Sequence, residues 1–146
     1  MYLTTEDLTQ AFSKTTLVQL SNDEPRATEP NEVVLQQAVQ SACERIDSAL
    51  RSRYRLPLSE VPTVIHNHGL YLARYWLYAR RPEKGMPQVV KETYDQAIKE
   101  LEQIAKGMLH LGLAPNHPPD EKHGDLLPDQ GEYRVKAAKR VDTEGY

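Results

Sequence analysis

Cysteine is almost absent from the sequence, and so are the long apolar runs and clustered glycines that several protein classes need. The single Cys43 excludes an internal disulfide framework and a cysteine-based zinc site. No stretch of 18 apolar residues could span a bilayer, and the N-terminus lacks the basic and apolar regions of a secretory signal. We therefore expect a soluble protein that stays inside the cell that makes it and does not contact a membrane.

Excess positive charge is also missing. The 146 residues include 18 Lys and Arg against 21 Asp and Glu, for a formal net charge of -3 at pH 7. This balance gives no global attraction to the phosphates of nucleic acid, so non-specific DNA binding is not expected. The length suits one domain, and a composition of 39% apolar and 27% charged residues indicates that part of the chain lies outside the core.

Apolar residues recur at three- and four-residue spacing in most of the first 106 positions, which is typical of helices that bury one face. Thr4 and Asp7 resemble a capping box, Pro62 suits the first position of a helix, and Gly107 suits a left-handed cap. We expect Trp76 to be largely buried between the helices predicted at 31–54 and 87–106. The pattern predicts helices over residues 5–12, 14–20, 31–54, 62–81 and 87–106.

Beyond Leu113 the composition changes. Residues 114–122 contain three prolines and almost no apolar side chain, so burial cannot compensate the entropy of ordering them. Residues 133–136 alternate apolar with basic side chains, a weak strand pattern. We therefore predict an all-α fold, a small bundle of about four helices with short N-terminal helices, in residues 1–113, followed by an extended C-terminal arm, 114–146, that partner contacts order.

Catalytic and metal-binding patterns are weak. Two positions apart on a helix, His66 and His68 point to different faces, unlike the spacing of helical zinc sites. Residues 117–125 hold more ligand types but no turn pattern that would preorganise them. Cys43 lies within a predicted helix as a small core residue would. We predict no enzyme activity, no metal and no cofactor, and keep a metal enzyme based on 117–125 as the weakest alternative.

Tyrosine and arginine are concentrated in the predicted helix at 62–81. Tyr71 and Tyr75 share a face there, and Arg74 lies beside them. Such a surface can stack bases and neutralise phosphates, but Tyr and Arg are also enriched at protein interfaces, and we favour packing or an inter-subunit seam. The alternative is a small helical DNA-binding regulator that uses residues 70–81 as a recognition helix, which the net charge disfavours.

Several stretches of the sequence resemble a family of small proteins encoded in Mu-like phages and prophages. They include residues 46–58 (IDSALRSRYRLPL), residues 72–82 (LARYWLYARRP) and residues 101–107 (LEQIAKG). The resemblance covers roughly the first 113 residues in order. The family is similar to the head-to-tail connector, or adaptor, proteins of tailed phages.

The resemblance implies a structural subunit of the virion neck, made in the cytoplasm of the bacterial host. Such subunits form a ring, usually twelvefold, around the DNA channel and contact the portal protein and a tail-completion or tail terminator protein. DNA would pass without specific binding. From residue type and predicted position, we expect the partner contacts to involve Arg51, Arg55, Tyr71, Arg74, Tyr75, Arg80, Arg81, Tyr133, Arg134, Val135, Lys136 and Val141.

Overall fold

The computed structural model describes residues 1–113, which form five α-helices, one short 3-10 helix and no strand. The predicted all-α fold is therefore confirmed for this part of the chain. The expectations for the arm, including the strand at 133–136 and the five contact residues beyond position 132, lie outside the described residues. The helices are α1 (Thr5–Ala11), α2 (Lys14–Ser21), α3 (Glu32–Leu50), α4 (Thr63–Ala79), η1 (Pro82–Lys84) and α5 (Gln88–Ala105).

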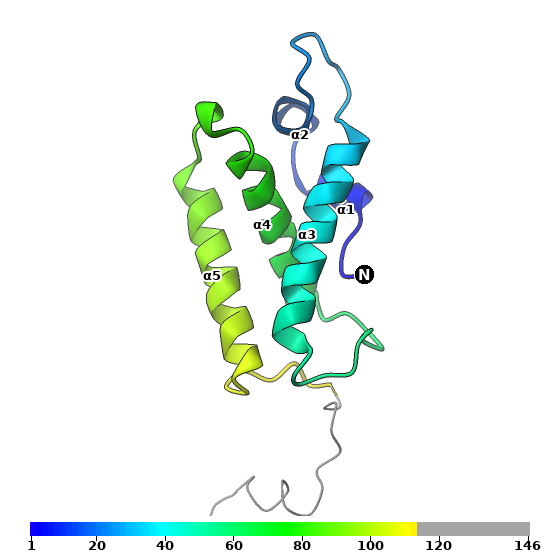
Figure 1. Ribbon diagram of the computed structural model, residues 1–146, viewed down its shortest axis with the longest axis vertical. Coiled ribbons are helices and arrows are strands. Elements are labelled where there is room, and N and C mark those ends of the chain that lie inside the picture. The colour runs from blue at the N-terminus through cyan, green and yellow to red at the C-terminus, as the bar shows by residue number, and fades with distance from the viewer. Residues whose placement is uncertain (114–146) are drawn as a thin grey trace, which may run out of the picture. The chain divides into compact units, whose positions relative to one another are not determined.

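The three long helices α3, α4 and α5 run side by side and alternate in direction (Figure 1). Their apolar positions face one another, as the helical spacing predicts. Leu35 and Ile46 of α3, Leu77 of α4 and Leu101 and Ile104 of α5 are all at most 1% exposed. Because the helices alternate, the C-terminal ends of α3 and α5 lie at the same end of the bundle.

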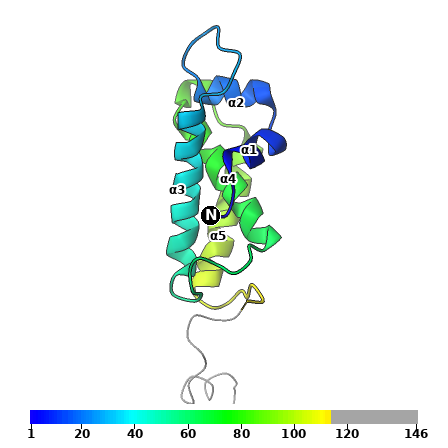
Figure 2. The same ribbon diagram turned by 90° about the vertical axis from the view of Figure 1, so that its right-hand side faces the viewer.

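The short helices α1 and α2 cover one side of this bundle, and α2 lies across its end (Figure 2). Leu8 of α1 and Leu17 of α2 are buried against α3 and α4. The predicted capping box is confirmed, because Thr4 N–H donates to an oxygen of Asp7 at 2.7 Å and Asp7 N–H donates to the Thr4 hydroxyl at 3.2 Å. A cap of this kind satisfies backbone donors that a seven-residue helix would otherwise leave free.

Leu3 and Gly69 explain how the N-terminal segment reaches the core. Leu3 is 2% exposed, and a side-chain carbon added at Gly69 would lie 2.8 Å from it. A glycine within α4 therefore makes room for the leucine. Nearby, the hydroxyl of the buried Tyr2 donates to the carboxylate of Asp47 on α3.

Three local predictions need correction. The helix predicted over 31–54 ends at Leu50, and beyond it the N–H groups of Arg53 and Tyr54 both donate to the Leu50 carbonyl at 2.9 Å in a turn. Pro62 lies one position before α4 as its N-cap. Trp76 is only partly buried and packs on the edge of the core. The left-handed backbone predicted at Gly107 is confirmed by its φ of +78°.

Candidate functional site

Three neighbouring arginines follow α3, and we call Arg51, Arg53 and Arg55 the basic turn. All three are exposed, and within residues 1–113 none lies within 4.0 Å of an acidic side chain. The buried Tyr54 anchors the turn, since its hydroxyl accepts a hydrogen bond from Leu111 N–H at 3.1 Å. The turn therefore presents unmatched positive charge from a fixed position.

Arg53 also connects the basic turn to the end of α5. Its Nε donates to the carbonyl of Ala105 at 3.2 Å, in the last turn of that helix. Helix C-termini carry partial negative charge on their free carbonyls, so an arginine is favourable at this position. Lys106 follows directly, is exposed, and likewise lacks an acidic neighbour among the described residues. The end of the bundle that holds the C-termini of α3 and α5 is therefore basic.

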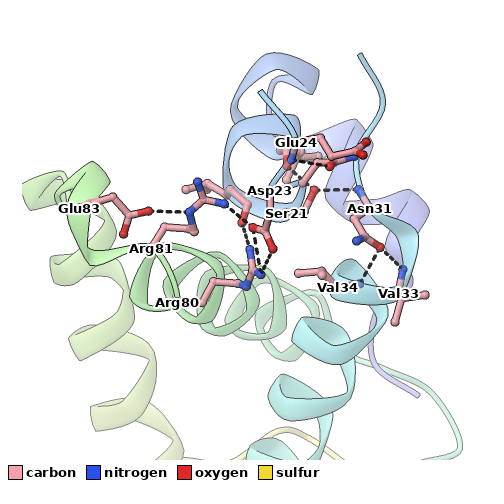
Figure 3. Close-up of polar contacts among 12 residues, drawn as sticks. Ser21, Asp23, Glu24, Asn31, Val33, Val34, Arg80, Arg81 and Glu83 are labelled. Carbon is pink, nitrogen blue, oxygen red and sulfur yellow. Dashed lines mark hydrogen bonds and ion pairs between the residues drawn. The ribbon is translucent and has the colours of Figure 1, made fainter. Parts of the chain in front are cut away.

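The opposite end of the bundle holds a cluster of ion pairs centred on Asp23 (Figure 3). Asp23, in the loop between α2 and α3, accepts from Arg81 at 2.5 Å and from Arg80 at 3.4 Å. Arg80 also donates to the carbonyl of Leu20 at 2.5 Å. Arg81 donates to Glu83 at 2.7 Å, and this hydrogen bond raises the pKa of Arg81 above its usual value. Both arginines thus fasten the loop to the end of α4.

The two ends of the same loop are joined by Ser21 and Asn31 (Figure 3). The fully buried Ser21 hydroxyl accepts from Asn31 N–H at 2.9 Å and donates to the Leu17 carbonyl at 2.6 Å. The side chain of Asn31 then caps α3 by accepting from Val33 N–H at 3.1 Å. These bonds satisfy backbone groups at a junction where two helices end, which fixes the loop that carries Asp23.

An aromatic cluster joins α4 to α1 and α5. The rings of Tyr75 and Tyr94 stack with centroids 3.7 Å apart and planes 15° from parallel. The guanidinium of Arg74 lies 4.9 Å from the ring centre of Phe12 and 5.5 Å from that of Tyr71. Burial lowers the pKa of Arg74 below its usual value. Its positive charge is therefore used within the chain, in cation–π contacts with Tyr71 of its own helix and with Phe12, the C-cap of α1.

A histidine and a carboxylate form a polar pair inside the bundle. His68 is 4% exposed, and its Nε2 lies 2.8 Å from Glu100 on α5. The amide of Gln96 donates to the other Glu100 oxygen at 2.5 Å, and this bond, followed by the contact with His68, lowers the pKa of Glu100. The ring of His66 has a different neighbour, the carbonyl of Tyr2 at 3.0 Å. The two histidines thus face different ways, as their spacing predicts.

Metal binding has no support in the described part of the chain. Among residues 1–113, no three His, Cys, Asp or Glu side chains are grouped so that they could hold a metal ion. The alternative ligand cluster at 117–125 lies outside the described residues. Across residues 1–113, every helix is too short or too polar to cross a lipid bilayer.

The contact residues predicted in the first 113 positions are spread over three places. The two in the basic turn are exposed, the two tyrosines are partly buried in the aromatic cluster, and the other arginines bond within the chain. These seven predicted contact residues are Arg51, Arg55, Tyr71, Tyr75, Arg74, Arg80 and Arg81.

Sequence reasoning missed Asp23 and Glu100, because their partners lie on distant segments and no local spacing signals them.

Together, the fold and these surfaces define a small all-α bundle in residues 1–113, fastened internally by ion pairs and carrying, at one end, positive charge that no acidic side chain of these residues matches. The chain belongs to the family described as Bacteriophage Mu, Gp36, which matches residues 2–127. It is 32% identical over 132 residues to "Mu-like prophage FluMu protein gp36" of Haemophilus influenzae, covering 90% of each chain. It is 26% identical over 139 residues to "Gene product J" of Escherichia phage Mu, covering 95% of this chain and 96% of that protein. The resemblance to proteins of Mu-like phages is confirmed.

Proposed function

We propose that the chain is a structural head-to-tail connector subunit of a Mu-like virion, without catalytic activity of its own. Copies would form a ring, twelvefold by analogy with other connectors, between the portal protein and the tail. The observation that carries the proposal is the basic turn, because Arg51 and Arg55 are exposed on a firmly anchored segment and have no acidic neighbour within residues 1–113. Charges that a fold does not match internally are suited to a partner surface.

Family membership supports a role in a phage particle, and the shape of the subunit supports a structural one. Ion pairs fasten the α2–α3 loop to the end of α4, a stacked tyrosine pair joins α4 to α5, and side-chain caps order the starts of α1 and α3. A ring needs subunits of fixed shape, because a heterologous interface closes only if each copy repeats the same rotation. The net charge of -3 suits a channel through which DNA slides, since it gives no strong affinity for phosphate.

The DNA-binding alternative is less well supported. A recognition helix over residues 70–81 would need Arg74, Arg80 and Arg81 free to contact phosphates or bases. Arg74 instead lies against two aromatic rings. Arg80 and Arg81 are bonded to Asp23, and their own side chains are only 24% and 19% exposed. Freeing them would break contacts that hold the α2–α3 loop. Within residues 1–113, the basic turn is the surface that this hypothesis would have to use.

Location in the virion tests the connector proposal directly. An epitope fused to the C-terminus of the chain, detected by gold-labelled antibody in negative-stain images of assembled particles, should place the label at the neck. Purified protein should also assemble into rings when portal protein is added, which mass measurement of the mixture would detect. Label on the capsid shell or at the tail tip, or no incorporation into particles, would contradict the proposal.

A further inference from the structure

A groove of about 330 Å3 lies next to the basic turn, between the first turn of α4 and the end of α5. Val64 lines it and is 39% exposed, which is high for a valine in a well-packed bundle. Leu109 and Leu111 add apolar surface, while Lys99 and Glu100 contribute one charge of each sign. The same Leu111 donates its N–H to Tyr54, so the groove and the basic turn adjoin.

Residues 114–132 have a charge opposite to that of the basic turn. They contain five acidic side chains and one lysine. Their one pair of adjacent leucines stands between two aspartates, in the sequence Asp125-Leu126-Leu127-Pro128-Asp129. The family match extends to residue 127 and so includes both leucines. A short segment of this composition offers apolar side chains and carboxylates together.

We propose that the groove and the basic turn bind residues 125–129 of a neighbouring copy of this chain. The inference rests on the proposed function, because a ring brings each copy next to another. Leu126 and Leu127 would occupy the apolar groove, while Asp125 and Asp129 would contact the basic turn. Arginine suits this role, since its planar guanidinium can bind a carboxylate through two parallel hydrogen bonds.

The apolar lining of the groove decides between this occupant and nucleic acid. A phosphate backbone would match the charge of the basic turn, but it carries no side chain to cover Val64 and Leu109. A leucine pair would remove that apolar surface from water, which is the main favourable term in most protein association. The segment therefore accounts for both features of the surface, and DNA accounts for one.

Peptide binding to the full-length chain tests the inference. The probe is a fluorescent peptide of residues 120–132, and the acceptor is the full-length L126D/L127D chain, whose own segment no longer competes. Fluorescence anisotropy should show saturable binding that weakens at higher salt. The further substitution R51E/R55E should weaken it by about tenfold or more, because two charge-assisted contacts become repulsive.

A matched control keeps the change of charge but moves it to the other end of the bundle. Arg26 and Lys84 are both exposed there and form no ion pair within residues 1–113. The substitution R26E/K84E should leave peptide binding unchanged. Equal losses in both variants, or equal binding of a peptide in which the two leucines are aspartates, would overturn the inference. Displacement of the peptide by random-sequence duplex DNA would also overturn it and identify a phosphate-binding surface.

Mixing two full-length variants tests whether the segment of one copy can dock on the groove of another. The R51E/R55E variant keeps residues 125–129 intact but has lost the basic turn, and the L126D/L127D variant keeps the groove and the basic turn but has lost the leucines. A mixture of the two should therefore form a heterodimer that neither variant forms alone, and native mass spectrometry would detect it. Failure to pair would overturn the assignment to a neighbouring copy. The neck-labelling experiment is independent: a neck label without peptide binding removes this inference alone, whereas the absence of a neck label removes the proposed function.

Discussion

The hydroxyl of Tyr54 accepts a hydrogen bond from the backbone N–H of Leu111 at 3.1 Å, across 57 residues of sequence. Tyr54 is 4% exposed, so its ring lies in the core while its oxygen reaches the segment that follows α5. The contact fixes the basic turn against the groove that we propose as a docking surface. The position of Arg53 and Arg55 on either side of Tyr54 thus depends on one buried ring.

Tyr54→Phe should lower the free energy of unfolding by about 1 kcal/mol, because the Leu111 N–H loses its partner while the packing of the ring is kept. Tyr75→Phe is the matched control, since Tyr75 stacks on Tyr94 through its ring. We expect a change near zero there. Urea unfolding followed by circular dichroism would measure both, and a similar loss in the two variants would show that the Tyr54 hydroxyl contributes nothing specific.

Arg80 and Arg81 both bind Asp23, but they should contribute unequally. Arg80→Met loses the bond to the Leu20 carbonyl as well as the contact with Asp23, whereas Arg81→Met loses pairs with the exposed carboxylates of Asp23 and Glu83. A hydrogen bond from a charged donor to a partly buried carbonyl contributes about 1.5 to 3 kcal/mol, more than ion pairs with exposed carboxylates, which water and salt screen. Thermal unfolding should therefore show the larger loss for Arg80→Met, and the reverse order would contradict the assignment.

The helices were predictable because their signals are local. The capping box of Thr4 and Asp7 specifies the start of α1, and the left-handed backbone of Gly107 follows the end of α5. Each signal acts within a few residues, and the structure confirms both. Tyr54 misled the prediction for α3, because it stands four residues after Leu50 and is buried like a further helical position. A turn that folds back onto the core gives the same apolar spacing as one more turn of helix.

The polar pairs were not predictable from local spacing. Asp23 meets Arg80 across 57 residues, and His68 meets Glu100 across 32. Each pair depends on how two helices or a loop are placed relative to one another, and neither partner has a distinctive neighbour in sequence. Arg51 and Arg55 of the basic turn were predicted as contact residues from residue type, and that role remains a prediction.

The stability of the protein should depend on the ionisation of Glu100. Its pKa is lowered below the ordinary value of 4.5 in the folded chain, mainly by the hydrogen bond from Gln96 and then by His68, while burial acts in the opposite direction. A carboxyl group with a lowered folded pKa stabilises the fold when ionised. This contribution is fully present above the unfolded value and is lost as the pH falls through the folded one.

Glu100→Gln removes that contribution, so the difference in unfolding free energy between the original chain and this variant should shrink as the pH falls below 4.5. Urea unfolding at a series of pH values would measure it. Gln96→Ala should raise the pKa of Glu100, as an NMR titration of the carboxyl carbon would show. A difference that stays constant with pH would contradict the lowered pKa.

Leu77 and Trp76 are neighbours on α4 that should respond differently to truncation. Leu77 is 0% exposed, so Leu77→Ala should cost about 2 to 5 kcal/mol through lost burial and the cavity left behind. Trp76 is only partly buried, and water can enter the space that Trp76→Ala creates. Its cost should fall below the usual range of about 3 to 5 kcal/mol for a large aromatic core residue. Guanidinium unfolding of the two variants would test this order.

Gly107 should be sensitive to substitution for two separable reasons. Its φ of +78° is unfavourable for any residue with a side chain, and a carbon added there would lie 2.6 Å from the guanidinium of Arg53. Gly112 has the same φ of +78° but nothing within 4 Å, so it isolates the backbone effect. Gly112→Ala should therefore cost about 1 to 2 kcal/mol, the usual penalty for a left-handed residue.

Gly107→Ala should cost more than Gly112→Ala, because the guanidinium must also move away and lose its bond to the Ala105 carbonyl, which contributes about 1 to 3 kcal/mol. The test is a double-mutant cycle with Arg53→Ala, in which the extra cost of Gly107→Ala should disappear because no guanidinium remains to be displaced. The cost of Gly112→Ala should not change in that background. If Gly107→Ala is equally destabilising with and without Arg53, the arginine is not held at the end of α5, and the basic turn lacks the fixed position on which its proposed role as a docking surface depends.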